Sequence, residues 1–210
     1  MQIRKTCLTW MLAAAAFAAA ANNSAAMTVI DFEDLRFKYD DPNNNRLPAN
    51  YAGFSWNAVA GYVARDFLPG TGYQTGTIGS VSMFNAWAED LSMSRGSLFD
   101  FAGAYITAAW NVNEKVTVEG WRDGALEYTS TIEASYPGPV HYDFGFNNIN
   151  RVVFRSLPED GVHVGSSGAA HIVIDNITYS VAPVPEPSTW LLLGFGTLAL
   201  LARRRFGNSE

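Results

Sequence analysis

The chain has 210 residues, with 14 Lys and Arg, 20 Asp and Glu, and a single cysteine. About 9 basic and 19 acidic residues, a net charge of about −10, remain once the charged residues of the two terminal segments are removed: Arg4, Lys5, Arg203, Arg204, Arg205 and Glu210. Such an acidic surface argues against nucleic acid and anionic lipid as partners, and it is compatible with divalent cations and neutral glycans.

Residues 1–26 have the three parts of a secretory signal peptide. Arg4-Lys5 is a basic segment, residues 7–21 form an alanine-rich apolar stretch, and Ser24-Ala25-Ala26 supplies small residues for cleavage. We therefore predict cleavage by a signal peptidase after Ala26. An N-terminal membrane anchor is the alternative, and the short apolar stretch disfavours it. The only cysteine, Cys7, lies in this segment, so thiol catalysis is excluded for the remaining chain.

Residues 27–182 have the pattern of one all-β domain. Apolar and polar residues alternate in short stretches bounded by Gly, Asn, Asp and Pro, which is typical of strands. Asp123-Gly124 predicts a hairpin turn, and residues 68–80 predict an ordered loop. The pattern predicts an antiparallel β-sandwich of jelly-roll type, with strands at 28–33, 53–56, 104–110, 115–121, 125–132, 140–144, 149–154 and 170–179.

Acidic residues lie on the first and the last predicted strand of this domain. Asp31 and Glu33 belong to the first strand, and Asp175 belongs to the last. Because the first and last strands of a jelly roll are often neighbours, these oxygens are predicted to meet and to offer ligands for a Ca²⁺ ion. The alternative is that Asp31 and Glu33 face solvent while Asp175 binds backbone.

Aromatic residues in the loop-rich half of the domain are candidates for contact with sugars. A flat ring stacks on the apolar face of a pyranose, and neighbouring polar groups bind its hydroxyls. We therefore predict ligand contacts for Tyr62, Tyr73 and Trp87, and the alternative for each ring is packing beneath a loop. Three further tryptophans fall on predicted strands and are expected in the core: Trp56, Trp110 and Trp121.

No arrangement of residues predicts catalysis. Glycoside hydrolysis needs a spaced pair of carboxylates, and no spacing singles out a pair among Glu89, Asp90, Glu119 and Asp143. The histidines lack the spacing of a metal-binding helix, and no G-x-S-x-G motif is present. We predict that the chain is not an enzyme.

The C-terminus combines a short motif, an apolar run and a basic stop. Residues 183–189 form a stiff, proline-rich linker that contains Pro185, Glu186 and Pro187. Residues 190–205 then predict a membrane helix that is apolar to Ala202 and ends at Arg203, Arg204 and Arg205 on the cytoplasmic side. The apolar run has 13 residues, fewer than the roughly 20 that span a bilayer. Transient insertion before processing suits that length better than a permanent anchor.

These features resemble the PEP-CTERM sorting signal of Gram-negative bacteria, over residues 184–205. The resemblance implies recognition by an exosortase, a membrane-embedded enzyme similar to cysteine transpeptidases. The domain also resembles the carbohydrate-binding jelly rolls, in which first- and last-strand acids commonly hold a structural calcium. It further resembles a recurring type of PEP-CTERM ectodomain. The segments that carry this second resemblance are residues 51–56, 69–73 and 174–177.

The sequence therefore predicts an exported protein of the cell surface or extracellular matrix that binds or scaffolds exopolysaccharide. One alternative is a purely structural matrix protein without a specific ligand. The other, which the absence of a catalytic pattern disfavours, is a polysaccharide hydrolase or lyase.

Overall fold

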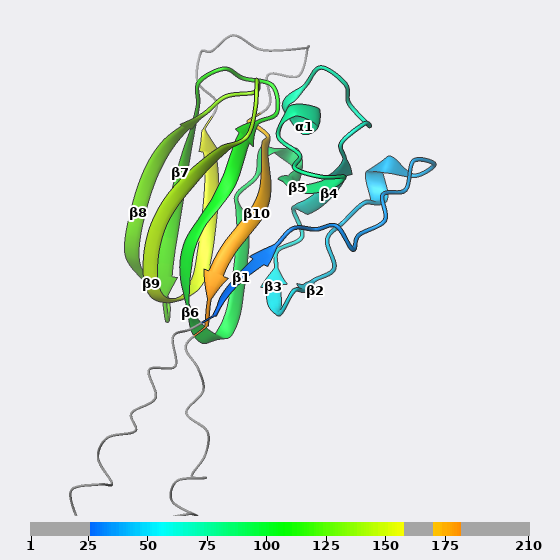
Figure 1. Cartoon of the computed structure of the whole chain (residues 1–210). Helices are drawn as coiled ribbons and strands as arrows, with labels where there is room; N and C mark the ends of the chain where they lie inside the picture. The colour runs from blue at the N-terminus through cyan, green and yellow to red at the C-terminus, as the bar shows by residue number, and fades with distance from the viewer. Residues whose placement is uncertain (1–25, 158–169, 182–210) are drawn as a thin grey trace, which may run out of the picture. The chain divides into compact units, whose positions relative to one another are not determined.

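Ten antiparallel strands account for most of residues 26–157 and 170–181, the ranges that the computed structural model describes (Figure 1). The segments predicted as signal peptide, linker, sorting motif and membrane helix lie outside these ranges. The strands are β1 (Met27–Ile30), β2 (Asn50–Tyr51), β3 (Phe54–Trp56), β4 (Ala60–Ala64), β5 (Val81–Asn85), β6 (Leu91–Ala108), β7 (Glu114–Arg122), β8 (Ala125–Ala134), β9 (Val140–Leu157) and β10 (Ile172–Ser180).

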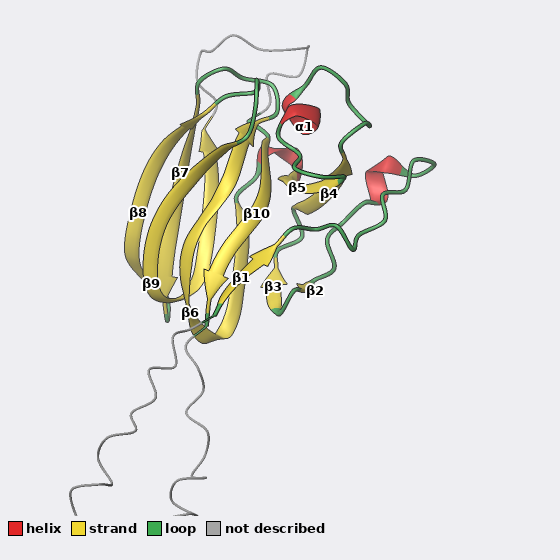
Figure 2. Ribbon diagram, in the orientation of Figure 1, coloured by secondary structure: helices red, strands yellow, loops and turns green. Residues whose placement is uncertain are grey.

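The strands are hydrogen-bonded in the order β4-β5-β10-β6-β9-β7-β8, with β1 paired to β10 and β3 paired to β6. The last strand therefore lies in the middle of the sheet. One edge of β10 pairs with β6, and its other edge pairs with β5 through Val173 and Ile174 and with β1 from Ile177 to Ser180. The expected neighbourhood of the first and last strands is confirmed, and so is the all-β antiparallel class. Figure 2 shows how little helix accompanies these strands.

Two long strands differ from the predicted pattern. We predicted a turn at 145–148 between two short strands, but β9 continues through this stretch for 18 residues. Gly145 and Asn148 have positive φ there, and the pairing of β9 with β6 shifts register nearby. These irregularities bend the strand without ending it. The strand predicted at 104–110 is likewise the end of β6, which starts at Leu91.

The hairpin turn at Asp123-Gly124 is confirmed. Arg122 pairs with Ala125, which leaves these two residues as the loop between β7 and β8. Both have positive φ, 50° for Asp123 and 86° for Gly124, as a type I′ turn requires.

The main apolar core is continuous and draws on most of the strands. Alternate residues of β7 point into it, with Val116 and Val118 fully buried between polar neighbours. Trp56 is also buried, as predicted, whereas Trp110 and Trp121 are only partly buried. The largest fully buried side chains are Phe32, Phe54, Phe99, Phe101, Phe154, Met83, Leu91, Met93, Ile106, Ile149, Ile172 and Ile174.

A smaller cluster covers the opposite face of β10. Val173 packs there against Val63, Tyr73 and Ala109, beneath the segment between β4 and β5. We predicted this segment as an ordered loop without helix, but it contains a single helical turn, α1 (Gly72–Thr75). The turn forms because the Thr71 hydroxyl accepts a hydrogen bond from the Tyr73 N–H and donates one to the Leu68 carbonyl.

The close approach of α1 to the end of β6 depends on a glycine. The Gly72 N–H donates to the Ala109 carbonyl at 2.9 Å, and a Cβ on Gly72 would lie 1.9 Å from the carbonyl oxygen of Ala108. No side-chain rotation relieves a contact with backbone, so only glycine fits without displacing α1.

We predict that Gly72→Ala lowers the melting temperature by several degrees, since it separates α1 from the sheet and exposes the smaller cluster. Thermal unfolding followed by circular dichroism measures the change. Gly138→Ala is the matched control, because a Cβ at Gly138 meets nothing within 4 Å and its φ is not positive. Equal melting temperatures for the two variants would contradict the packing role of Gly72.

Candidate functional site

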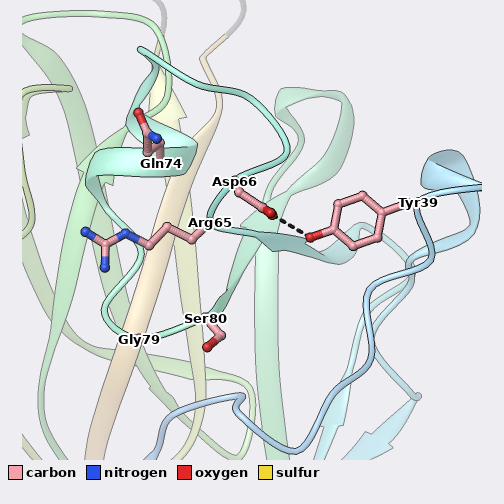
Figure 3. A pocket seen from close by; sticks show the side chains of 6 residues that line it. All are labelled: Tyr39, Arg65, Asp66, Gln74, Gly79 and Ser80. Atoms are coloured by element: carbon pink, nitrogen blue, oxygen red, sulfur yellow. Dashed lines mark hydrogen bonds between the residues drawn. The ribbon is translucent and has the colours of Figure 1, made fainter.

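An open, polar hollow of about 390 Å³ lies beside the segment that carries α1 (Figure 3). It offers one aromatic ring, one carboxylate, one guanidinium, one amide and one hydroxyl group. Its lining residues are Tyr39, Arg65, Asp66, Gln74, Gly79 and Ser80. A ring with several convergent polar groups is the composition expected of a site for a polyhydroxylated ligand.

Tyr39 supplies the aromatic ring, which is 58% exposed. Its hydroxyl donates a hydrogen bond to the Asp66 carboxylate, drawn as a dashed line in Figure 3, and this bond raises the pKa of Tyr39. The loop that carries Tyr39 is held by the buried side chain of Asn45. The Asn45 amide accepts from the Lys38 N–H at 2.8 Å and donates to the carbonyls of Lys38 and Pro42. The ring is therefore exposed but positioned.

Two carboxylates fix the opposite wall, at Gly79 and Ser80. Glu33 accepts hydrogen bonds from the N–H groups of Ser80 at 2.8 Å and Val81 at 3.2 Å. Asp175 on β10 accepts from the Ile78 N–H at 2.8 Å. Since Gly79 has a φ of +86° and a Cβ there would lie 2.4 Å from Glu33 Oε1, the glycine is required by both the turn and the carboxylate.

The three acids predicted to bind calcium thus come near one another, although the arrangement differs from a metal centre. Burial raises the pKa of Asp175 to about 7, and the charges of Glu33 and Asp31 add to this rise. However, within residues 26–157 and 170–181 no group of three or more His, Cys, Asp or Glu side chains is placed to hold a metal ion. Asp31, Glu33 and Asp175 are therefore not assembled as a three-carboxylate centre, because Glu33 and Asp175 bind backbone amides. Calcium binding stays a prediction.

Two of the three predicted sugar-binding aromatics are buried. Tyr62 lies on β4, is 7% exposed, and donates from its hydroxyl to the Arg36 carbonyl at 3.1 Å. Tyr73 lies in α1, is 3% exposed, and has its hydroxyl 2.5 Å from His171 Nδ1. The expectation of loop positions with exposed rings is wrong for these two residues, because Tyr62 belongs to the main core and Tyr73 packs against Val63 and Val173 in the smaller cluster.

Trp87 is the predicted aromatic that does face solvent. Its side chain is 63% exposed, and the Arg46 guanidinium lies over its ring, with Cζ 3.8 Å from the ring centroid. The turn that carries it, η2 (Ala86–Ala88), follows β5 directly.

The carboxylates considered for catalysis have structural partners. Arg155 donates from Nε to Glu119 at 3.0 Å and forms an ion pair with Asp90 through its terminal nitrogen. Asp143 is 90% exposed beside His141. A carboxylate that the sequence did not single out, Glu114, is fully buried. Its Oε2 accepts from Asn111 at 2.6 Å while its Oε1 has no hydrogen-bond partner among the described residues.

Sequence reasoning did not select Tyr39, Gln74 or Ser80 as site residues, nor Arg65 or Asp66. A usable signal for Tyr39 was present. It is an aromatic residue followed by Asp40-Asp41-Pro42-Asn43-Asn44-Asn45, a polar turn sequence that provides no apolar surface to bury a ring locally.

Comparison with protein-family models identifies a PEP-CTERM protein-sorting motif at residues 183–205. This confirms the predicted sorting signal with Pro185, Glu186 and Pro187, although its residues lie outside the described ranges. The motif indicates an exported protein that an exosortase sorts to the cell surface or extracellular space. Where the structure describes the chain, no helix is long and apolar enough to cross a membrane.

No curated protein matches the chain. Among solved structures, a DUF4465 family protein from Bacteroides caccae is similar at 16% identity, over 77% of this chain and 88% of that one, with a TM-score of 0.39. A family two carbohydrate esterase from Cellvibrio japonicus has 10% identity over 76% of this chain and 35% of its own, with a TM-score of 0.40. TmCBM61, in complex with β-1,4-galactotriose, has 9% identity over 70% of this chain and 100% of its own, with a TM-score of 0.35. With TM-scores below 0.5, these likenesses decide neither the ligand nor the activity.

Calcium is tested by the melting temperature of the secreted protein. If the first- and last-strand acids bind Ca²⁺, the protein melts at a higher temperature in calcium than in EDTA, because a ligand that binds only the folded state stabilises it. Glu33→Gln removes one charged ligand and is expected to abolish the difference. Asp143→Asn, at an exposed carboxylate, is expected to retain it. Identical melting temperatures in calcium and in EDTA would contradict the predicted calcium site.

Glu114 predicts a pH dependence of stability. Burial raises its pKa to about 7, so between its unfolded pKa and pH 7 the folded protein keeps a proton that the unfolded chain releases. Its contribution to stability is present at low pH and is lost as pH rises to 7, by up to about 1.4 kcal/mol per pH unit. Urea unfolding of the wild type and Glu114→Gln from pH 4.5 to 8 isolates this group. The variant is expected to gain stability relative to the wild type as pH rises, by about 3 kcal/mol in all. A constant difference would refute the shift.

Proposed function

We propose that this chain is an exported surface or matrix protein whose jelly-roll-type β-sandwich binds exopolysaccharide in the hollow around Tyr39. The observation that carries the proposal is an exposed ring at the edge of a polar hollow, with its hydroxyl hydrogen-bonded to Asp66. Its sorting motif supports delivery to the compartment where exopolysaccharide accumulates.

The chemistry of the hollow suits a sugar. The Tyr39 ring can stack on the C–H face of a pyranose, while Asp66 and Gln74 can accept and donate hydrogen bonds to hydroxyl groups. The Asp66 carboxylate also fixes the tyrosine, so little side-chain entropy is lost when a ligand binds. The wall formed by Ser80 is fixed by Glu33, which keeps the hollow open without a ligand.

A purely structural matrix protein is the principal alternative. It would need no ordered aromatic at the surface, and the two anchors of Tyr39, Asp66 and Asn45, would then only close a loop. A hydrolase or lyase is the third possibility, and it would shorten the polymer rather than retain it. Binding and depolymerisation measurements on the same exopolysaccharide separate the three.

We predict that Tyr39→Ala weakens binding of the secreted protein to exopolysaccharide isolated from the producing strain by about fivefold or more, because the stacking surface is lost. Affinity electrophoresis in gels that contain the polymer measures the retardation. Tyr39→Phe keeps the ring and is expected to retain most of the affinity.

Three results decide between the alternatives. No retardation of the wild type by any polysaccharide favours the structural protein. Retardation that Tyr39→Ala leaves unchanged excludes this hollow as the site. A fall in polymer length during incubation identifies an enzyme.

A further inference from the structure

The turn that carries Trp87 has backbone dihedral angles that tryptophan and alanine rarely adopt. Trp87 and Ala88 have φ of 59° and 56°, and the Glu89 N–H donates to the Ala86 carbonyl at 3.4 Å. Positive φ at both central residues is the type I′ pattern, which strongly favours Asn-Gly. A bulky side chain in this conformation is strained. Trp87 is therefore placed where an asparagine or glycine would fold more easily.

Buried polar contacts hold the turn in this conformation. The Asn85 amide, fully buried, donates to the carbonyls of Glu89 and Ala170 at 3.2 Å and accepts from the Ile172 N–H at 2.6 Å. The Ala86 N–H donates to the Val59 carbonyl at 2.8 Å. The turn is thus tied to the loop before β4 and to the start of β10. The indole does not contribute to this fixation, since it is 63% exposed.

Arg46 adds a cation to the exposed ring. Its backbone pairs with Gly61 of β4, and its guanidinium lies over the indole with Cζ 3.8 Å from the ring centroid. Within residues 26–157 and 170–181 the guanidinium makes no hydrogen bond or ion pair. Its five N–H donors form a planar fork whose geometry matches a carboxylate.

We propose that Trp87 and Arg46 form a binding site for a pyranose that carries a carboxylate, such as a uronate unit of an acidic polysaccharide. Because the Arg46 guanidinium lies over one face of the indole, that side chain moves to the edge of the ring when the sugar stacks there, and its guanidinium then donates hydrogen bonds to the sugar carboxylate. This site is separate from the Tyr39 hollow in its residues, and it rests on the proposed function in that both require the protein to bind polysaccharide.

The acidity of the domain does not oppose such a site at physiological ionic strength. Charges beyond about 8 Å are screened there, so the guanidinium in direct contact with the carboxylate decides the local interaction. The same screening weakens the attraction or repulsion between distant charges of the protein and the ligand carboxylate. The selectivity for a carboxylate therefore depends on Arg46 itself.

The test uses the full-length secreted protein with polygalacturonate and with the same polymer after reduction of its carboxyl groups to neutral hydroxymethyl groups. We expect the wild type to bind polygalacturonate at least about tenfold more tightly than the reduced polymer. Trp87→Asn is expected to lose at least about tenfold in affinity for polygalacturonate while its melting temperature is equal or higher, because asparagine suits the turn. Arg46→Gln is expected to remove the preference between the two polymers.

Ala88→Gly is the matched control, because it relieves the same backbone strain and leaves the ring in place. It is expected to bind as the wild type does and to melt at an equal or higher temperature. A Trp87→Asn variant that melts several degrees lower and binds normally would overturn the proposal, since the indole would then serve packing. Equal affinity of the wild type for polygalacturonate and the reduced polymer would also overturn the proposal. It would not contradict sugar binding at Tyr39. Failure of the wild type to bind any glycan would contradict both this site and the proposed binding at the Tyr39 hollow.

Discussion

The final strand, β10, is hydrogen-bonded along both edges and covered on both faces, and the arrangement of the domain depends on it. β6 occupies one edge, and β5 and β1 share the other. Ile172 and Ile174 face the main core, while Val173 faces the cluster beneath α1. A strand in this position joins the N-terminal strand, the β4–β5 hairpin and the long β6–β9 pair into one sheet. β1 and β5 reach the β6–β9 part of the sheet only through the last strand.

Buried polar side chains extend this organisation into the loops. Asp175 on β10 and Glu33 just after β1 hold the segment from Ile78 to Val81, which forms one wall of the hollow. Asn45 closes the loop that carries Tyr39, and Asn85 holds the turn that carries Trp87. Each replaces backbone pairing where the chain leaves the sheet, so that otherwise unsupported loops keep one conformation. The exposed rings of Tyr39 and Trp87 thus lie on loops whose backbones are held by the buried amides of Asn45 and Asn85.

The sequence supported the strands better than the site. Alternation located β7 and β8 almost to the residue, and Asp123-Gly124 identified their turn, because both signals depend on near neighbours. The first half of β6 was missed since Ser92 to Ser97 is polar and shows little apolar alternation, and β9 was divided at a glycine and asparagine stretch that only bends it. The meeting of Glu33 and Asp175 near one segment was anticipated. For Asp175, backbone binding was the stated alternative. The use of Glu33 as an amide acceptor was not anticipated, because it depends on the backbone of Ser80 and Val81, far away in sequence.

The sequence by itself determined the sorting address and the all-β class, because a contiguous motif and a two-residue period are local properties of the chain. Only the tertiary structure decided which aromatic rings face solvent. Tyr62 and Tyr73 were both predicted to contact a ligand, yet packing against other segments buries them, whereas Tyr39, which was not selected, is exposed. It also brought Arg46 over Trp87, from positions 41 residues apart, through the pairing of Arg46 with Gly61. Side-chain partnership is set by long-range packing, and so is most of the exposure, for which the polar run after Tyr39 is one local signal.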